Sequence, residues 1–148
     1  MSTPSRLLLL DTNIVIFLVR GGAVGAALDS RFQLRARPDR PLVSVVTLGE
    51  ALAFAQKHSW GSPRIGRLRE LMRELVPVDI RAQPVLDRYA EIDTFLSRSG
   101  RALSDNDVWI AACASATEAT LLTTDRDFDP LADQYLDRVW VDPRNPSG

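Results

Sequence analysis

The sequence is poor in three residue types that often define a protein's chemistry. It has a single cysteine, Cys113, which excludes an internal disulfide, and the surrounding AACASA favours a buried packing role for it. It has a single histidine, His58, so the chain offers no Cys/His set for zinc. Lys57 is the only lysine, and the excess of arginine fits a genome bias as readily as a chemical role.

A long apolar run and a strong net charge are also missing. No apolar segment approaches the roughly 20 residues that cross a bilayer. The start, MSTPSRLLLLD, has no secretory apolar core because Asp11 interrupts it early, so we expect a cytoplasmic protein with no membrane contact. A net charge of −1 argues against a general polyanion binder, but it allows a local basic rim around an acidic site.

The length and composition are those of one ordinary globular domain. The chain has 148 residues, of which 45% are hydrophobic and 25% charged. Hydrophobic patterning predicts short strands that alternate with helices, which indicates an α/β fold with a mostly parallel sheet covered on both faces. The strands are expected at 6–10, 41–46, 76–80, 119–124 and 138–141, and helices at 14–22, 23–36, 47–58, 62–75, from Pro84 to about Leu96, and 104–116.

Carboxylates recur where a predicted strand ends or the next helix begins. In an open parallel sheet these positions share one edge, and ligands bind there. Acidic residues from four distant segments are therefore expected to converge on one cleft. They are Asp11, Glu50, Asp105 with Asp107, and Asp125 with Asp127 and Asp129.

Each carboxylate also has a simpler interpretation. Thr47 to Glu50 fits a capping box in the first turn of a helix, and Ser104 to Asp107 fits a similar cap. Asp11 is suited to cap the helix that follows it, and Asp125 to a polar turn. Taken singly, each cap is the safer interpretation.

Taken together, the caps explain less. Clustered carboxylates repel one another in a cleft of low dielectric, so either some take up protons or a cation holds them together. All the donors are oxygens, which points to Mg²⁺, with Mn²⁺ as the alternative ion. The sequence therefore predicts that Asp11 is tolerated beside LLLL because it is a metal ligand.

Four blocks, in this order, resemble the PIN domain, and most closely the VapC-type toxins of bacterial toxin–antitoxin pairs. The blocks are LLLLDTNI, VSVVTLGEALAFA, NDVWIAACA and LLTTDRDF, and the likeness extends from residue 7 to about residue 142. It implies a PIN-like three-layer fold and a single domain over 1–148. The family's acidic positions correspond to Asp11, Glu50 and Asp107, and the fourth to Asp125 or, as a substitute, Asp127. Its supporting polar positions correspond to Thr12, Asn13 and Thr123.

The resemblance implies a metal-dependent endoribonuclease toxin that hydrolyses RNA phosphodiester bonds, for example in a tRNA loop. It also implies a cognate antitoxin and a homodimer within a larger complex. Basic side chains near the cleft are expected to hold the RNA backbone, with Arg35, Lys57 and Arg64 as candidates or, equally, as solvated surface. Apolar residues of the helices at 23–36 and 62–75 are candidates for the antitoxin groove, for a homodimer face or, more simply, for ordinary core; they include Ile65, Leu68 and Met72.

Two alternatives remain. A PIN nuclease of RNA processing or DNA repair would have the same fold and no antitoxin; a small antitoxin-like reading frame directly upstream would distinguish the two. A receiver-like signalling module would also bind Mg²⁺ in an acidic pocket, but it should carry a lysine after a late strand. Lys57, the only lysine, lies in the wrong region for that role.

Overall fold

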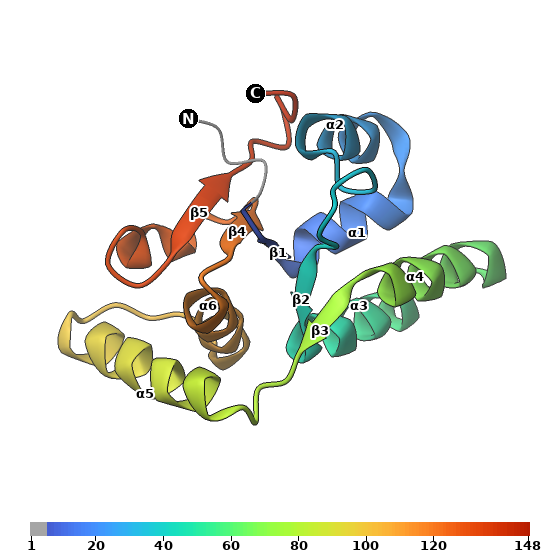
Figure 1. Ribbon diagram of the computed structural model, residues 1–148. Coiled ribbons are helices and arrows are strands. Elements are labelled where there is room, and N and C mark those ends of the chain that lie inside the picture. Colours follow the sequence, from blue (N-terminus) through green and yellow to red (C-terminus); the bar gives the residue numbers. More distant parts are fainter. Residues whose placement is uncertain (1–5) are drawn as a thin grey trace.

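The computed structural model describes residues 6–148 (Figure 1). Residues 1–5 lie outside the described residues. They are the start of the segment MSTPSRLLLLD, in which no secretory apolar core is expected. The elements follow in the order β1 (Leu8–Leu10), α1 (Thr12–Arg20), α2 (Gly22–Phe32), β2 (Leu42–Ser44), α3 (Val45–Lys57), α4 (Ser62–Glu74), β3 (Val76–Val78), α5 (Gln83–Arg98), α6 (Asp105–Thr117), β4 (Thr120–Thr123), a 3₁₀ helix (Arg126–Leu131) and β5 (Asp137–Trp140).

The strands form one sheet in the order β3-β2-β1-β4-β5, and all the pairings are parallel. The predicted mostly parallel sheet is confirmed, as is the edge position of β3, which contains Pro77. Because the chain proceeds from β1 outwards to β3 and then returns to the other side, β1 and β4 flank a topological switch point. A receiver-type sheet has the order 2-1-3-4-5, so the signalling alternative is wrong.

Helices cover both faces of the sheet, as the resemblance implies. Alternate side chains of β1 point to opposite faces: Leu10 joins the core under α1 to α4, whereas Leu9 joins the core under α5 and α6. Figure 1 shows α5 and α6 on one side of the sheet and the other four helices across from them. Helix α6 is buried in its middle, at Val108 and from Ile110 to Ala114, and Cys113 is a fully buried packing residue, as predicted.

Helix α3 begins earlier than the sequence predicts. Val45 and Val46 were expected in the second strand because β-branched residues favour strands, but they form the first turn of α3. Ser44 is the N-cap, and its hydroxyl accepts a hydrogen bond from the Val46 backbone N–H at 3.1 Å. The Thr47 to Glu50 capping box is therefore wrong, and Glu50 lies in the second turn.

Two other boundaries differ from expectation. The helix expected to reach residue 36 ends at Phe32, because Gln33 adopts the left-handed conformation at φ 51° and caps it. The turn predicted after β4 is a 3₁₀ helix, which begins after Asp125.

Leu68 and Leu71 of α4 are buried in the core, whereas Ile65 and Met72 are partly buried against it.

Within residues 6–148, no single helix is long and apolar enough to span a membrane. Helices α1 and α2 are long and apolar enough for this only if they are counted as one segment, and the chain bends by 115° between them, at Gly21. Helix α1 buries Ile14 and Val15 completely, as a core helix does.

Candidate active site

The acidic side chains gather at the carboxyl edge of the sheet, beside the switch point. Asp11 follows β1 directly and Asp125 lies two residues beyond β4, so adjacent parallel strands deliver both. Helices α3 and α6 add Glu50 and Asp107. The structure thus brings together residues that are far apart in the sequence, as predicted from strand ends.

Asp11 is buried with an exposed fraction of only 4%. Its Oδ1 accepts a hydrogen bond from the Thr12 backbone N–H at 2.8 Å, and its Oδ2 accepts one from the Thr123 hydroxyl at 2.6 Å. The pKa of Asp11 is nevertheless raised to about 6, mainly by burial, with a smaller contribution from the negative charges of Asp107 and Asp125. Asp11 is thus both the cap of α1 and a carboxylate whose ionised form is destabilised by burial.

Glu50 is oriented by side chains from two other helices. The Thr12 hydroxyl donates to Glu50 Oε1 at 2.6 Å, and the Asn106 amide donates to Oε2 at 3.1 Å. The buried Thr47 hydroxyl lies 3.0 Å from that of Thr12 and extends the network. Both carboxylate oxygens of Glu50 are therefore held in place from α1 and α6.

Asp107 occupies the centre of the negative charge. Desolvation raises its pKa, and the charges of Asp125, Glu50 and Asp127 add to the effect, while a hydrogen bond with Ser104 opposes it. The Ser104 hydroxyl accepts from the Asp107 backbone N–H at 3.2 Å, so the predicted cap exists and also positions the carboxylate.

Asp125 fits the fourth acidic position better than Asp127. The charge of Asp125 raises the pKa of both Asp11 and Asp107, whereas the charge of Asp127 raises only that of Asp107. The Thr123 hydroxyl accepts a hydrogen bond from the Asp125 backbone N–H at 2.9 Å. The same hydroxyl donates to Asp11, so it links the backbone of Asp125 to the Asp11 carboxylate. The choice between Asp125 and Asp127 as a ligand stays a prediction.

The remaining acidic residues of these segments lie elsewhere. Asp105 is exposed, and its charge adds to desolvation in raising the pKa of Tyr89 on α5. Asp129 forms an ion pair with Arg138 of β5 at 2.9 Å. Asn13, expected to hold a carboxylate, instead donates to the Thr124 hydroxyl at 3.4 Å.

The donor set fits a hard divalent cation. Every candidate ligand offers carboxylate oxygen. The pKa of Asp11 is raised mainly by burial and to a smaller extent by the charges of Asp107 and Asp125, and a cation at this place would favour the ionised form against both effects. Within residues 6–148 no three His, Cys, Asp or Glu side chains already stand as a ready ligand set. Mg²⁺ does not need one, since it keeps several waters and takes one or two carboxylates directly.

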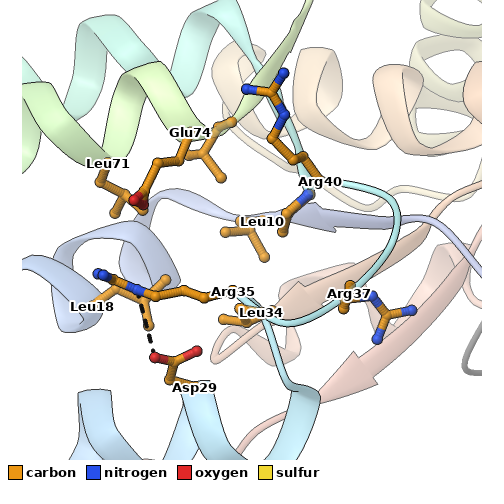
Figure 2. Close-up of a pocket in the computed structure, with 11 residues that line it drawn as sticks. Leu10, Leu18, Asp29, Leu34, Arg35, Arg37, Arg40, Leu71 and Glu74 are labelled. Atoms are coloured by element: carbon orange, nitrogen blue, oxygen red, sulfur yellow. Dashed lines mark ion pairs between the residues drawn. The ribbon is translucent and has the colours of Figure 1, made fainter.

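The three predicted RNA-binding residues lie in different places. Lys57 lines a groove together with Thr12 and Glu50, beside the acidic site. Arg64 lies over the Trp60 ring at 5.4 Å, at the start of α4. Arg35 pairs with Asp29 and lines a separate pocket at the amino ends of β2 and β3, so the structure does not bring it to the acidic residues (Figure 2).

Sequence reasoning missed three neighbours of the site. Asn106 donates a hydrogen bond to Glu50, and Thr47 contacts the hydroxyl of Thr12, which itself donates to Glu50. In the sequence, Asn106 and Thr47 resemble ordinary residues of the first helical turn. Arg126 follows Asp125, and its guanidinium lies 3.9 Å from the centre of the Trp140 ring. The pattern DRD was the only local signal for Arg126, because its aromatic partner comes from another strand.

Comparison with known proteins agrees with this geometry. The sequence profile of the PIN domain matches residues 8–134. Ribonuclease VapC5 of Mycobacterium tuberculosis is 33% identical over 135 residues, which cover 88% of this chain and 92% of VapC5. Ribonuclease VapC1 of Haemophilus influenzae (strain R2866) is 30% identical over 129 residues, which cover 84% of this chain and 92% of VapC1.

Solved structures show the same fold. VapBC2 from Rickettsia felis, bound to a DNA fragment from its promoter, superposes with a TM-score of 0.76 and 22% identity, covering 90% of this chain and 97% of that chain. VapBC-1 from nontypeable Haemophilus influenzae gives a TM-score of 0.75 at 24% identity over the same shares. From the sequence match and the fold, the chain belongs to the PIN domain family and, within it, to the VapC group.

Proposed function

We propose that this protein is a divalent-metal-dependent endoribonuclease and the toxin of a toxin–antitoxin pair. The observation that carries the proposal is the meeting of Asp11, Glu50, Asp107 and Asp125 at the switch point of the sheet. The chain spans nearly the full length of relatives named ribonuclease VapC, which supports the same activity here.

The residues that would hold the ion are Asp11, Glu50, Asp107 and Asp125, with Asp127 as the alternative to Asp125. A bound Mg²⁺ or Mn²⁺ would supply positive charge that offsets the scissile phosphate, lowers the pKa of the water that attacks phosphorus in line, and stabilises the oxygen that leaves as the P–O bond breaks. The protein's own task is to present the carboxylates in a fixed geometry. Thr123 and Thr12 orient Asp11, and Asn106 orients Glu50. The positive N-terminus of α6 favours an ionised Asp107.

The proposed substrate is a structured RNA cut in an unpaired loop, such as a tRNA loop. Sequence-selective proteins read RNA mostly where bases are splayed out of a helix, because the major groove of an RNA duplex is too narrow for side chains. Lys57 beside the site is suited to hold a phosphate of such a loop.

The proposed partners are a cognate antitoxin and a second copy of this chain, in the cytoplasm. The VapBC complexes that share this fold support an antitoxin partner. The alternative, a PIN nuclease that acts without an antitoxin, predicts no small reading frame directly upstream. Sedimentation of the purified protein tests the homodimer.

The test compares cleavage of total RNA by wild type, Asp107→Asn and Asp105→Asn, with Mg²⁺, Mn²⁺ or EDTA, after any co-purified partner has been removed. The two variants make the same change two residues apart, but only Asp107 lies among the carboxylates. We expect discrete, metal-dependent fragments from wild type and Asp105→Asn and none from Asp107→Asn. Equal activity of the two variants would contradict the proposal.

A further inference from the structure

A groove beside α3 continues from the acidic site towards the C-terminus of that helix. At one end it is lined by Thr12, Glu50 and Asn106, which belong to the acidic site. At the other end it is lined by Phe54 and Lys57, near the C-terminus of α3. We call this feature, with Gly49 in its wall, the α3 groove.

The sequence of α3 divides the helix into two faces. Thr47, Ala51 and Ala55 recur every four residues and are buried in the core. The groove-lining residues Val46, Glu50, Ala53 and Lys57 recur at intervals of four, three and four residues, so they form a second stripe along the helix. Glu50 and Lys57 are seven residues apart, so the stripe between them is about 10 Å long.

Gly49, one residue before Glu50, lines the groove with backbone atoms alone because it has no side chain. Gly49 is exposed, and a Cβ added there would meet no atom within 4 Å. Neither packing nor a positive φ therefore requires glycine at this position. Its consequence is that the backbone of α3 itself forms part of the groove, so a flat group can approach it closely.

Phe54 and Lys57 line the far end of the groove, and a second aromatic ring and a second cation lie against Phe54 without lining the groove themselves. The His58 ring is exposed and stacks on the Phe54 ring, with 3.8 Å between ring centres and 15° between planes. The Arg20 guanidinium lies 5.2 Å from the centre of the same Phe54 ring. With the exposed Lys57 beside them, these groups offer a platform for a base and cations for phosphates.

We infer that the α3 groove holds the single-stranded part of the RNA substrate as it leaves the acidic site. This inference rests on the proposed ribonuclease function. Bases lie against the Gly49 wall and the Phe54–His58 stack, and Lys57 contacts a phosphate. A length of about 10 Å matches about three stacked nucleotides at roughly 3.4 Å each. Bases in a duplex are paired and stacked, so they are not free to lie against this wall.

The first test blocks the groove without disturbing the fold. Gly49→Gln places a neutral, helix-favouring side chain in the groove, and Gly66→Gln makes the same change in α4, where an added Cβ also meets no atom within 4 Å. Both are made in the Asp11→Asn background, which prevents cleavage. Binding of a fluorescein-labelled oligouridine is measured by anisotropy at fixed Mg²⁺. We expect about tenfold weaker binding for Gly49→Gln, the scale of losing one stacked base, and no change for Gly66→Gln.

The second test separates charge from stacking. Lys57→Gln should lower the slope of log K against log salt by about 0.7, the value for one phosphate contact on a single strand. Arg69→Gln, which removes an exposed positive charge on α4, should leave the slope unchanged. His58→Ala should weaken binding about tenfold with no change in slope.

Equal affinities of Gly49→Gln and Gly66→Gln for oligouridine would overturn the inference. If the wild type still cleaves RNA and Asp107→Asn does not, the nuclease stands and only the groove assignment falls. If the wild type cleaves no RNA, the proposed function itself fails. If Gly49→Gln leaves RNA affinity unchanged but converts a dimer to a monomer in sedimentation, the groove is a contact between two copies and the inference is wrong.

Discussion

The Thr123 hydroxyl donates a 2.6 Å hydrogen bond to Oδ2 of Asp11, and both side chains are buried. This contact joins the end of β4 to the end of β1 at the point where the strand order reverses. Thr123 also accepts from the Asp125 backbone N–H, so one hydroxyl positions two of the four carboxylates.

Replacing this hydroxyl should damage both stability and activity. Thr123→Val leaves a buried carboxylate oxygen without its donor, and we expect it to lower the free energy of unfolding by about 1 to 3 kcal/mol. Thr120→Val, in the same strand, is the matched control, because the buried Thr120 hydroxyl has no hydrogen-bond partner within residues 6–148. Urea denaturation of the two variants measures the difference; equal losses would mean that the hydroxyl of Thr123 is not needed.

The pH dependence of stability should carry a signature of Asp11. The pKa of Asp11 is about 6 in the metal-free folded protein, above its usual value of about 4, so the folded state binds more protons between these pH values. The associated stability is fully present below about pH 4 and is lost as the pH rises through about 6, by up to about 3 kcal/mol.

Asp11→Asn removes this titration and keeps the shape of the side chain. Its amide NH₂ replaces one acceptor oxygen, so one of the two hydrogen bonds from Thr12 and Thr123 is lost or reversed, at a cost that is the same at every pH. In EDTA, the variant should therefore gain stability over wild type as the pH rises from about 4.5 to about 7.5. Urea midpoints at both pH values test this, because groups remote from Asp11 titrate equally in both proteins; Asp107 and Asp125, whose charges act on Asp11, lose the same repulsion in the variant. Parallel pH profiles of the two proteins would show that ionisation of Asp11 does not destabilise the folded state.

Mg²⁺ should reverse the same penalty. A cation that binds the ionised carboxylates of the folded state stabilises it, by about 2.7 kcal/mol at a concentration one hundred times its Kd. Protons compete for these carboxylates, so the rise in Tm should be larger at about pH 7.5 than at about pH 5. Asp105→Asn should keep the rise and Asp107→Asn should lose it, as measured by thermal unfolding. An equal rise in all three proteins would place the ion elsewhere.

Asn106 should matter for activity more than for stability. Asn106→Ala frees one oxygen of Glu50 at an exposed position, and we expect a loss of RNA cleavage of about tenfold with little change in Tm. Asn106→Asp places a second negative charge beside Glu50 and should lose more activity at low Mg²⁺ than at high Mg²⁺. The measurement is the cleavage rate as a function of Mg²⁺ concentration. If the two variants behave identically, charge at this position is irrelevant.

Local pattern predicted most elements, and the misses have local causes. Helix α6 was predicted because its apolar residues continue around the helix after a serine cap, and both signals lie within one segment. The start of α3 was misplaced because Val45 and Val46 favour a strand, while the cap at Ser44 outweighs that preference. Arg35 was considered for RNA binding, but its place at the opposite edge of the sheet depends on how α2 packs.

By itself, the sequence determined the order of strands and helices and which carboxylates follow strand ends, because apolar periodicity and turn position are properties of neighbouring residues. Only the tertiary structure decided which carboxylate each supporting side chain contacts. Asn106 reaches Glu50 across 56 positions and Thr123 reaches Asp11 across 112. Such pairs depend on the order of strands in the sheet and on which face each helix covers. These features follow from burying both faces of the sheet together, and no single segment of the chain specifies them.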